Sequence, residues 1–449
     1  MIRSCLVAVL IGAVSDSVAA ADRPNVVVVL VDDFGWGDPS CYGNTMVKTP
    51  NIDRLAKEGI RFTQGYVASP ICSPSRCAII TGQFPARWKI TSYLQTKAGN
   101  RACEMADYLD PKAPSLPQML RDAGYATAHI GKWHLGGGRD VVDPPKFAAY
   151  GYDLGLGTYE SPEPASPLGL KTTPWGPPEK REPQQVPRHD RSRWMIDQTL
   201  EFLGKNKGRP CFVNLWLDDT HTPYSPSEEQ MAAVKKLGEG ERKTRYKAVL
   251  ANLDREIGRL IEGLKGTNTL VLLLGDNGCS PPFERERTAG LRGQKLSLYE
   301  GGIRVPFIAW RPGKIKGGIV NDRIVFATVD FIPTLATICS AKLPQGFTPD
   351  GEDMSAALRG ETPTRTKPLF WEYGRNDTSF DYPKEAKHRS PNVAAREGEW
   401  KLLVRADGRG AELYNFVADP NETKNLAAEQ PVIAKRLADM ALAWRKSLP

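Results

Sequence analysis

Residues 72–82 read Cys72-Ser73-Pro74-Ser75-Arg76-Cys77-Ala78-Ile79-Ile80-Thr81-Gly82. The apolar residues 78–80 predict one side of a helix that begins near Ser75, and the amide groups at the start of such a helix attract an anion. The guanidinium of Arg76 can hold an oxyanion through a fork of hydrogen bonds. The stretch therefore predicts an anion-binding turn. The alternative is that Cys72 and Cys77 form a structural disulfide or remain buried thiols.

On both sides of this stretch, apolar strands alternate with amphipathic helices. Strands are predicted over residues 25–31, 126–130, 211–217 and 269–274. Helices are predicted over residues 49–56, 115–123, 193–206 and 246–264. This alternation is typical of an α/β fold, and continuous β-branched runs such as residues 25–31 indicate buried strands of a parallel sheet.

The pattern changes after about residue 350, where short strand-like pieces separated by turns predict a small antiparallel sheet. Residues 431–444 predict a helix that packs on it. We therefore expect a signal peptide at residues 1–20, a large domain at residues 21–352 and an α+β subdomain at residues 353–449. The first segment combines Arg3 with an apolar run and small residues before a cleavage point, which predicts export to the periplasm or the extracellular space.

Polar side chains gather where four of the predicted strands end. Because the carboxyl ends of parallel strands meet at one edge of a sheet, we expect these clusters to share one site. Close carboxylates repel unless a cation neutralises them, and hard oxygen ligands suit Ca²⁺ or Mg²⁺. Acidic residues at strand ends also commonly cap helices, so each pair alone is a weak indication. The clusters are Asp32-Asp33, Lys132 with His134, residues 218–221, and Asp276-Asn277.

Three segments resemble the signatures of one enzyme family. Cys72 followed by Pro74, Arg76 and Thr81-Gly82 resembles the sulfatase signature, and residues 131–134 resemble the family's second signature. Residues 293–306 resemble the family's lysine segment. The chain is thus identified as a member of the formylglycine-dependent, arylsulfatase-like sulfatases of the alkaline-phosphatase-like superfamily. The resemblance implies a large, mixed, mostly parallel sheet flanked by helices, with a smaller C-terminal antiparallel sheet and helix.

The resemblance also implies a mechanism. In this family a separate maturation enzyme oxidises the cysteine to formylglycine, and a hydroxyl of the hydrated aldehyde attacks sulfur. For this chain we expect two lysines and an arginine to hold the sulfate, one histidine to protonate the leaving alcohol, and another to take a proton from the second hydroxyl. The implied catalytic residues are Arg76, Lys132 and Lys295 for the sulfate, His221 for the alcohol, His134 for the second hydroxyl, and Cys72. The implied ligands of Ca²⁺, with Mg²⁺ as the alternative ion, are Asp32, Asp33, Cys72, Asp276 and Asn277.

Charge, export and long loops favour a sulfated carbohydrate as the substrate. The formal net charge is +8, which favours polyanionic partners, and we expect sulfated polysaccharide rather than nucleic acid or a membrane. The alternative is a solvated basic surface that binds no ligand. The proline-rich residues 152–189 predict either a substrate-shaping loop that contains Trp175 or a surface excursion. Lys384, His388 and Arg389 are predicted to line outer subsites. The alternatives are a phosphate or phosphonate ester hydrolase on the same scaffold, and a non-catalytic binder of sulfated glycans with Cys72 unmodified.

Overall fold

A computed structural model describes residues 23–158, 160–163, 186–234, 239–281 and 283–449. The predicted signal peptide, the candidate contact Trp175 and most of the proline-rich segment lie outside the described residues. The predicted division at residues 352 and 353 stays a prediction.

The centre of the molecule is an eight-stranded sheet with the strand order β5-β4-β6-β1-β7-β8-β2-β9. β1 lies parallel to β6 and β7, whereas β8 lies antiparallel to β7 and β2. The prediction of a mixed, mostly parallel sheet is confirmed. The strands are β1 Asn25–Val31, β2 Ile60–Phe62, β4 Ala126–Lys132, β5 Leu154–Thr158, β6 Cys211–Leu217, β7 Thr269–Gly275, β8 Phe307–Trp310 and β9 Ile319–Asn321.

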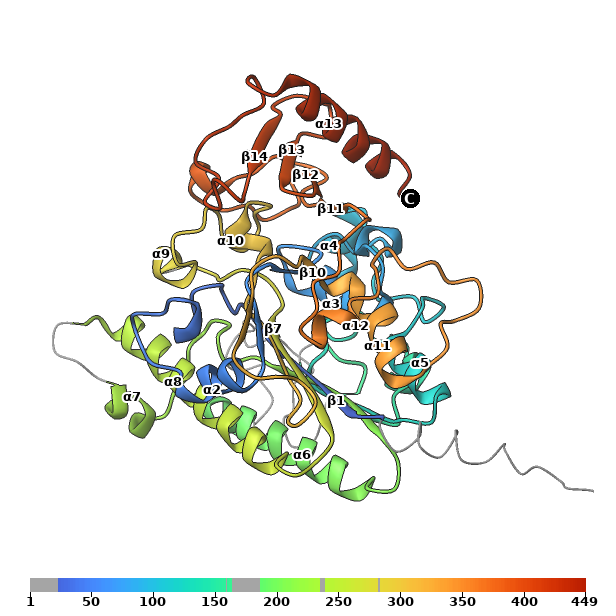
Figure 1. Cartoon of the computed structure of the whole chain (residues 1–449), viewed down its shortest axis with the longest axis vertical. Helices are drawn as coiled ribbons and strands as arrows, with labels where there is room; N and C mark the ends of the chain where they lie inside the picture. Colours follow the sequence, from blue (N-terminus) through green and yellow to red (C-terminus); the bar gives the residue numbers. More distant parts are fainter. Residues whose placement is uncertain (1–22, 159, 164–185, 235–238, 282) are drawn as a thin grey trace, which may run out of the picture.

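Helices cover both faces of this sheet (Figure 1), because alternate side chains of each strand point to opposite sides. Val26, Val28 and Leu30 pack in the cluster that includes α3, α5 and α11. Val27, Val29 and Val31 pack in the cluster that includes α2, α6 and α8. The helices are α2 Pro50–Glu58, α3 Cys72–Thr81, α5 Leu116–Asp122, α6 Arg191–Lys205, α8 Glu241–Gly263 and α11 Phe331–Cys339.

Helix α3 differs from its prediction. It begins at Cys72 rather than near Ser75, and all ten of its residues are buried, so it has no solvent-facing side. Pro74 is tolerated in the first turn because the amides there have no partner within the helix. Gly82 ends the helix in the left-handed conformation, with φ 62°. Residue 72 is consequently held by the first turn of a rigid, buried helix.

The C-terminal part forms a separate four-stranded antiparallel sheet with the order β11-β12-β13-β14, above the main sheet in Figure 1. These strands are β11 Leu369–Glu372, β12 Val393–Glu397, β13 Trp400–Val404 and β14 Glu412–Asn415, and α13 Pro431–Lys446 packs against them. The predicted C-terminal sheet and helix are therefore confirmed. A buried ammonium, Lys401 Nζ, joins this sheet to the main domain at 2.9 Å from a carboxylate oxygen of Glu300.

The prediction that residues 152–189 form a loop throughout is wrong, because they contain β5, the edge strand next to β4.

Short elements complete the fold. The remaining strands are β3 Gly65–Tyr66 and β10 Phe326–Ala327. The remaining α-helices are α4 Lys97–Ala102, α7 Glu228–Val234, α9 Glu284–Arg287, α10 Glu300–Ile303 and α12 Ser355–Leu358. The 3-10 helices are Ser40–Tyr42, Pro85–Trp88, Phe147–Tyr150, Arg188–Asp190, Thr328–Asp330 and Ala386–His388.

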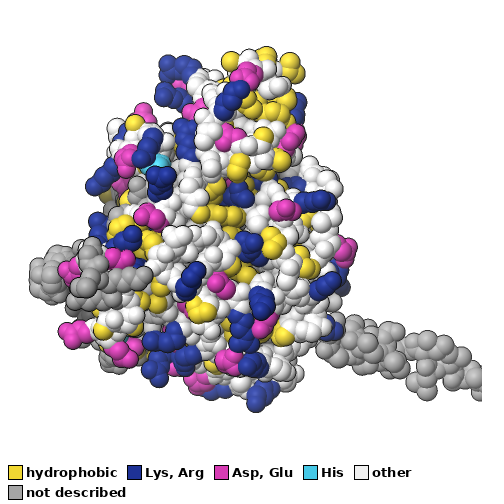
Figure 2. Space-filling view, turned by 60° about the vertical axis from the view of Figure 1, so that its left-hand side comes forward, with side chains coloured by type: hydrophobic (Ala, Val, Ile, Leu, Met, Phe, Trp, Pro, Cys, Tyr) yellow, Lys and Arg dark blue, Asp and Glu magenta, His cyan; other side chains and the backbone are white. Residues whose placement is uncertain are grey.

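Charged side chains of both signs are interspersed on the face shown in Figure 2. Lysine and arginine are scattered among aspartate and glutamate there rather than gathered in one patch. Among the described residues, no helix has the length and apolar character needed to cross a membrane.

Candidate active site

The predicted polar clusters come together because their strands are neighbours in the sheet. β4, β6, β1 and β7 lie side by side and run parallel, so their carboxyl ends share one edge. Asp32 follows β1, Lys132 ends β4, residues 218–221 follow β6 and Asp276 follows β7. The start of α3 supplies Cys72 to the same place.

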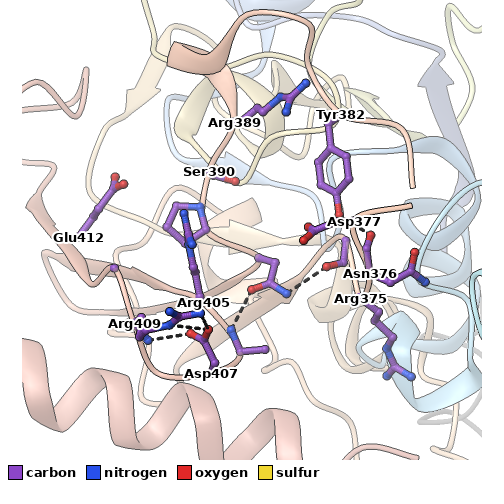
Figure 3. Close-up of a pocket in the computed structure, with 15 residues that line it drawn as sticks. Arg375, Asn376, Asp377, Tyr382, Arg389, Ser390, Arg405, Asp407, Arg409 and Glu412 are labelled. Atoms are coloured by element: carbon purple, nitrogen blue, oxygen red, sulfur yellow. Dashed lines mark hydrogen bonds and ion pairs between the residues drawn. The ribbon is translucent and has the colours of Figure 1, made fainter. Parts of the chain in front are cut away.

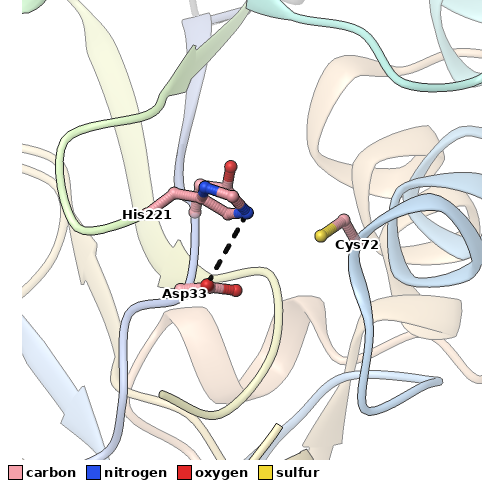
Figure 4. A group of neighbouring side chains, drawn as sticks. Asp33, Cys72 and His221 are labelled. Atoms are coloured by element: carbon pink, nitrogen blue, oxygen red, sulfur yellow. Dashed lines mark ion pairs between the residues drawn. The ribbon is translucent and has the colours of Figure 1, made fainter. Parts of the chain in front are cut away.

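Four side chains form the centre of this site: Asp32, Asp33, Cys72 and His221 each offer one ligand atom, and these atoms all lie within 4.8 Å of one another. Figure 4 shows the sulfur of Cys72 directed from the first turn of α3 toward Asp33 and His221. Nε2 of His221 lies 3.8 Å from Oδ2 of Asp33. Parts of the chain that are nearly 190 residues apart thus meet at one point.

Two lysines neutralise the carboxylates of this centre. Nζ of Lys132 lies 2.5 Å from Oδ2 of Asp32. Nζ of Lys295 lies 2.6 Å from Oδ1 of Asp33 and 3.5 Å from Sγ of Cys72. Burial alone would raise the pKa of both aspartates, but the nearby cations outweigh it, so the pKa of Asp33 is lowered to about 2 and that of Asp32 lies well below its usual value. Both carboxylates are therefore ionised and available to bind a cation.

Arg76 is held against the sheet edge by its own ion pair. Its Nη2 lies 2.6 Å from Oδ2 of Asp276, and its Nη1 donates to the carbonyl oxygen of Lys132 at 2.8 Å. Oδ1 of Asp276 accepts a hydrogen bond from the amide of Asp33 at 2.9 Å. Burial, with the neighbouring carboxylate of Asp32, raises the pKa of Asp276 to about 7 even though Arg76 opposes the shift. Arg76 is thereby fixed in place beside residue 72.

The donor set fits a hard divalent cation. Oδ1 of Asp32 and Oδ1 of Asn277 are buried without a hydrogen-bond partner in the described part of the chain. Nδ2 of Asn277 donates to Oδ1 of Asp33 at 2.8 Å, which leaves the amide oxygen as an unused acceptor. Buried oxygens without a hydrogen-bond partner among the described residues, next to ionised carboxylates, suit Ca²⁺ or Mg²⁺. His221, predicted as a proton donor, also belongs to the central group.

The thiol of Cys72 is not a thiolate at neutral pH. Burial raises its pKa to about 12, although Lys132 and Lys295 oppose the shift. Cys72 and Cys77 are both free, so the alternative of a disulfide between them is wrong. An unmodified Cys72 is therefore a weak nucleophile in this environment.

Sequence reasoning missed one side chain of the site, Glu160. Its Oε2 lies 2.8 Å from Nε2 of His134, and both residues are buried. Glu160 comes just after β5, in the segment that was predicted to be a loop. No periodicity or motif marks it in the sequence, since its importance comes from a contact across the fold.

The predicted outer contacts separate in the structure. Arg389 lines a cleft of about 650 Å³ in the C-terminal subdomain, together with Arg375, Tyr382 and Arg405 (Figure 3). His388 is buried and Lys384 is exposed, and neither is among the residues that line this cleft. Arginine, asparagine and aspartate side chains are among the residues that line it.

Two overlapping stretches of the chain match known protein families. Residues 24–340 match the family described as Sulfatase, and residues 293–443 match the family described as N-sulphoglucosamine sulphohydrolase, C-terminal. The first match covers well over half of the chain, so the chain belongs to the sulfatase family. It is a sulfuric ester hydrolase of the arylsulfatase-like type.

Individual relatives give more detail. The N-acetylgalactosamine-6-O-sulfatase of Bacteroides thetaiotaomicron is 28% identical over 94% of this chain and 93% of its own length. The crystal structure of Ps i-CgsB in complex with k-i-k-neocarrahexaose has a TM-score of 0.74 and 26% identity, covering 94% of this chain and 92% of that one. A phosphonate monoester hydrolase of Agrobacterium radiobacter shares the fold, with a TM-score of 0.65 and 19% identity over 94% of this chain and 96% of that one.

Proposed function

We propose that this sulfatase removes sulfate from a sulfated carbohydrate, using a formylglycine made from Cys72 and a bound divalent cation. The observation that carries this proposal is the meeting of Asp32, Asp33, Cys72 and His221 within 4.8 Å, with Lys132 and Lys295 beside them. The carboxylates of this group can bind a hard cation, and its lysines can bind an anion. Together they suit a sulfate ester.

Conversion of Cys72 to formylglycine would replace a thiol that is poorly suited to this site. A buried, protonated thiol is a poor nucleophile toward sulfur and a poor ligand for a hard cation. Hydrated formylglycine supplies instead a hydroxyl nucleophile, and its second hydroxyl offers a route to release sulfate without attack of water on sulfur. A separate maturation enzyme is required to make it.

The oxygen-bearing side chains of the site are the proposed cation ligands. Asp32, Asp33, residue 72, Asp276 and Asn277 would hold the cation, with Ca²⁺ favoured and Mg²⁺ as the alternative. When bound, such an ion lowers the pKa of an adjacent hydroxyl and polarises a sulfate oxygen.

The basic residues orient the ester and move protons. Lys132, Lys295 and Arg76 neutralise the sulfate oxygens and fix the position of sulfur. Nδ1 of His221 lies 2.6 Å from the carbonyl oxygen of Thr222, which holds the ring in place for proton donation to the leaving alcohol. Burial lowers the pKa of His221 to about 4, and the negative charge of a bound sulfate raises it again. His134 accepts the proton of the second hydroxyl.

Three observations support a carbohydrate as the alcohol. The relatives named above include an N-acetylgalactosamine-6-O-sulfatase and a protein in complex with k-i-k-neocarrahexaose. The net charge is +8. The cleft that contains Arg389 offers guanidinium groups and the ring of Tyr382, which suit a sulfated sugar. We also propose export to the periplasm or the extracellular space through residues 1–20, a step that cell fractionation and N-terminal sequencing test.

The test compares sulfate release from defined sulfated saccharides with phosphate and phosphonate release from esters of matched alcohols. We expect sulfate release to exceed the other two by orders of magnitude in kcat/KM. Preferential hydrolysis of the phosphonate would favour the second candidate, which the shared fold with a phosphonate monoester hydrolase makes worth testing. Binding of sulfated saccharides without release of any product would indicate the non-catalytic alternative.

A further inference from the structure

Glu160 and His134 form a buried pair beside the catalytic edge. Nε2 of His134 lies 2.8 Å from Oε2 of Glu160. The other oxygen of Glu160 accepts a hydrogen bond from Nε of Arg139, also at 2.8 Å. Burial alone would raise the pKa of Glu160, but His134 and Arg139 outweigh it and lower the pKa to about 2. Glu160 is therefore a carboxylate at neutral pH.

A second acceptor determines which nitrogen of His134 carries the proton. The carbonyl oxygen of Leu94 lies 3.1 Å from the same Nε2. A carboxylate and a carbonyl only accept hydrogen bonds, so Nε2 carries the hydrogen of the neutral imidazole. Nδ1 then keeps its lone pair, and it is buried with no hydrogen-bond partner among the residues that the structure describes.

An unsatisfied buried nitrogen is costly. Leaving such an acceptor without a partner costs about 1–3 kcal/mol. Glu160 and Leu94 hold the ring through its Nε2. In this orientation Nδ1 has no hydrogen-bond partner among the described residues. Nδ1 is thus the atom of His134 that is ready to accept a proton.

We propose that Glu160 is the positioning residue that makes His134 a general base at Nδ1. This inference deepens the proposed function and rests on it. The carboxylate fixes the Nε2–H tautomer, and it stabilises the imidazolium that forms when Nδ1 gains a proton. The proton on Nε2 stays on Nε2 throughout, and Arg139 holds the carboxylate in place.

Two cations, Lys132 and Arg76, also act on His134. Burial lowers the pKa of His134, and Lys132 and Arg76 lower it further, whereas Glu160 raises it. The ring of Tyr93 lies 6.5 Å from the imidazole ring and adds no formal charge. Replacing Glu160 with a neutral residue of the same size therefore lowers the pKa of His134 and weakens it as a base.

Histidine NMR tests the tautomer without relying on turnover. The chain has five histidines, so protein labelled with ¹⁵N-histidine gives a spectrum simple enough to assign with a His134→Gln variant. We expect the neutral ring of His134 to carry its proton on Nε2 in the wild-type protein. A proton on Nδ1 would overturn the inference.

Kinetics test the functional part. We expect Glu160→Gln to lower kcat by about 100-fold, the smallest contribution usual for a positioned general base, and to move the acidic limb of the kcat profile to lower pH. Glu163→Gln is the matched control, because Glu163 lies in the same segment and accepts from the backbone amide of Phe147 at 3.1 Å. Equal kcat and equal pH profiles for the two variants would overturn the inference.

A third variant separates positioning from folding. In Glu160→Ala, added formate is expected to restore part of kcat, because a small carboxylate can occupy the space beside Nε2. Loss of kcat that formate does not restore, with the pH profile of the remaining activity unmoved, would contradict the inference. A wild-type protein with formylglycine that releases no sulfate contradicts the proposed function, and the NMR spectrum then still decides the tautomer.

Discussion

Arg76 on α3 and Asp276 after β7 form an ion pair of 2.6 Å in which neither side chain is exposed to solvent. The pair links the helix that carries residue 72 to the edge of the sheet. Since the two residues are 200 positions apart, their contact fixes a long-range relationship on which the geometry of the whole site depends.

Breaking this ion pair should destabilise the protein strongly. Arg76→Met leaves the buried carboxylates of Asp276 and Asp32 without their neighbouring guanidinium, and removal of one partner of a buried pair costs about 3–5 kcal/mol. We expect this loss in the free energy of unfolding, measured by urea titration of the metal-free protein. Arg54→Met is the control, because Arg54 pairs with Glu58 and Glu262 at the surface and each such pair is worth at most about 1 kcal/mol. Similar losses in both variants would contradict the prediction.

Replacing Cys72 should abolish activity and preserve the fold. Cys72→Ala removes the precursor of the nucleophile, so sulfate release should fall to the background rate while the far-ultraviolet circular dichroism stays unchanged. Cys77→Ala is a matched control, since Cys77 is a fully buried cysteine of the same helix. We expect the control to lose stability through the cavity but to retain activity. Retained activity in Cys72→Ala would refute the mechanism.

Metal removal should lower both activity and thermal stability. A ligand that binds only the folded protein stabilises it by about 2.7 kcal/mol at a concentration of 100 times its Kd. We therefore expect a chelator to lower Tm and stop turnover, and Ca²⁺ to restore both more effectively than Mg²⁺. Asp33→Asn should remove the Ca²⁺-dependent shift in Tm. A chelator-treated protein with full activity and unchanged Tm would contradict the proposed cation.

The junction between the main domain and the C-terminal sheet should make stability depend on pH. Nζ of Lys401 lies 2.9 Å from both Glu300 and Glu422, and all three side chains are buried. Burial and the nearby Glu300 raise the pKa of Glu422 from 4.5 to about 7, against the effect of Lys401. Folded Glu422 thus binds its proton more tightly than unfolded Glu422 does. Its contribution to stability is complete below pH 4.5 and is lost as the pH rises through about 7.

Glu422→Gln should remove this pH dependence. Wild-type protein is expected to lose about 3 kcal/mol of unfolding free energy between pH 4.5 and 7 through this group, and the variant should not show that part of the decline. Urea titrations at pH 5 and pH 8 measure the difference. Glu429→Gln is the control, because Glu429 pairs with Lys424 at the surface. The same decline in the wild type and in Glu422→Gln would contradict the prediction.

Much of the fold was predictable because the central strands are buried on both faces. The bounds of β1 and β6 agree with the predicted residues 25–31 and 211–217, because both runs are almost entirely apolar and an aspartate follows each of them directly. The short strands β2 and β9 were not predicted. Each has three residues, which is too few for a pattern, and their place in the sheet depends on partners far along the chain.

The site was likewise predictable only in part. Asp32, Lys132 and Asp276 could be placed together from sequence, because parallel strands deliver their carboxyl ends to one edge. Glu160 could not, since it follows an edge strand within a proline-rich segment and reaches His134 only through the tertiary fold. The pairing of Arg76 with Asp276 was not predicted either, because the motif that contains Arg76 does not indicate which residue Arg76 contacts.

The measurement that tests the central claim most directly is the mass of the peptide that contains residue 72, taken from active protein purified from its native host. Formylglycine predicts that sulfur is replaced by oxygen and that two hydrogens are lost. An unmodified cysteine in protein that releases sulfate would contradict the claim that residue 72 becomes the nucleophile.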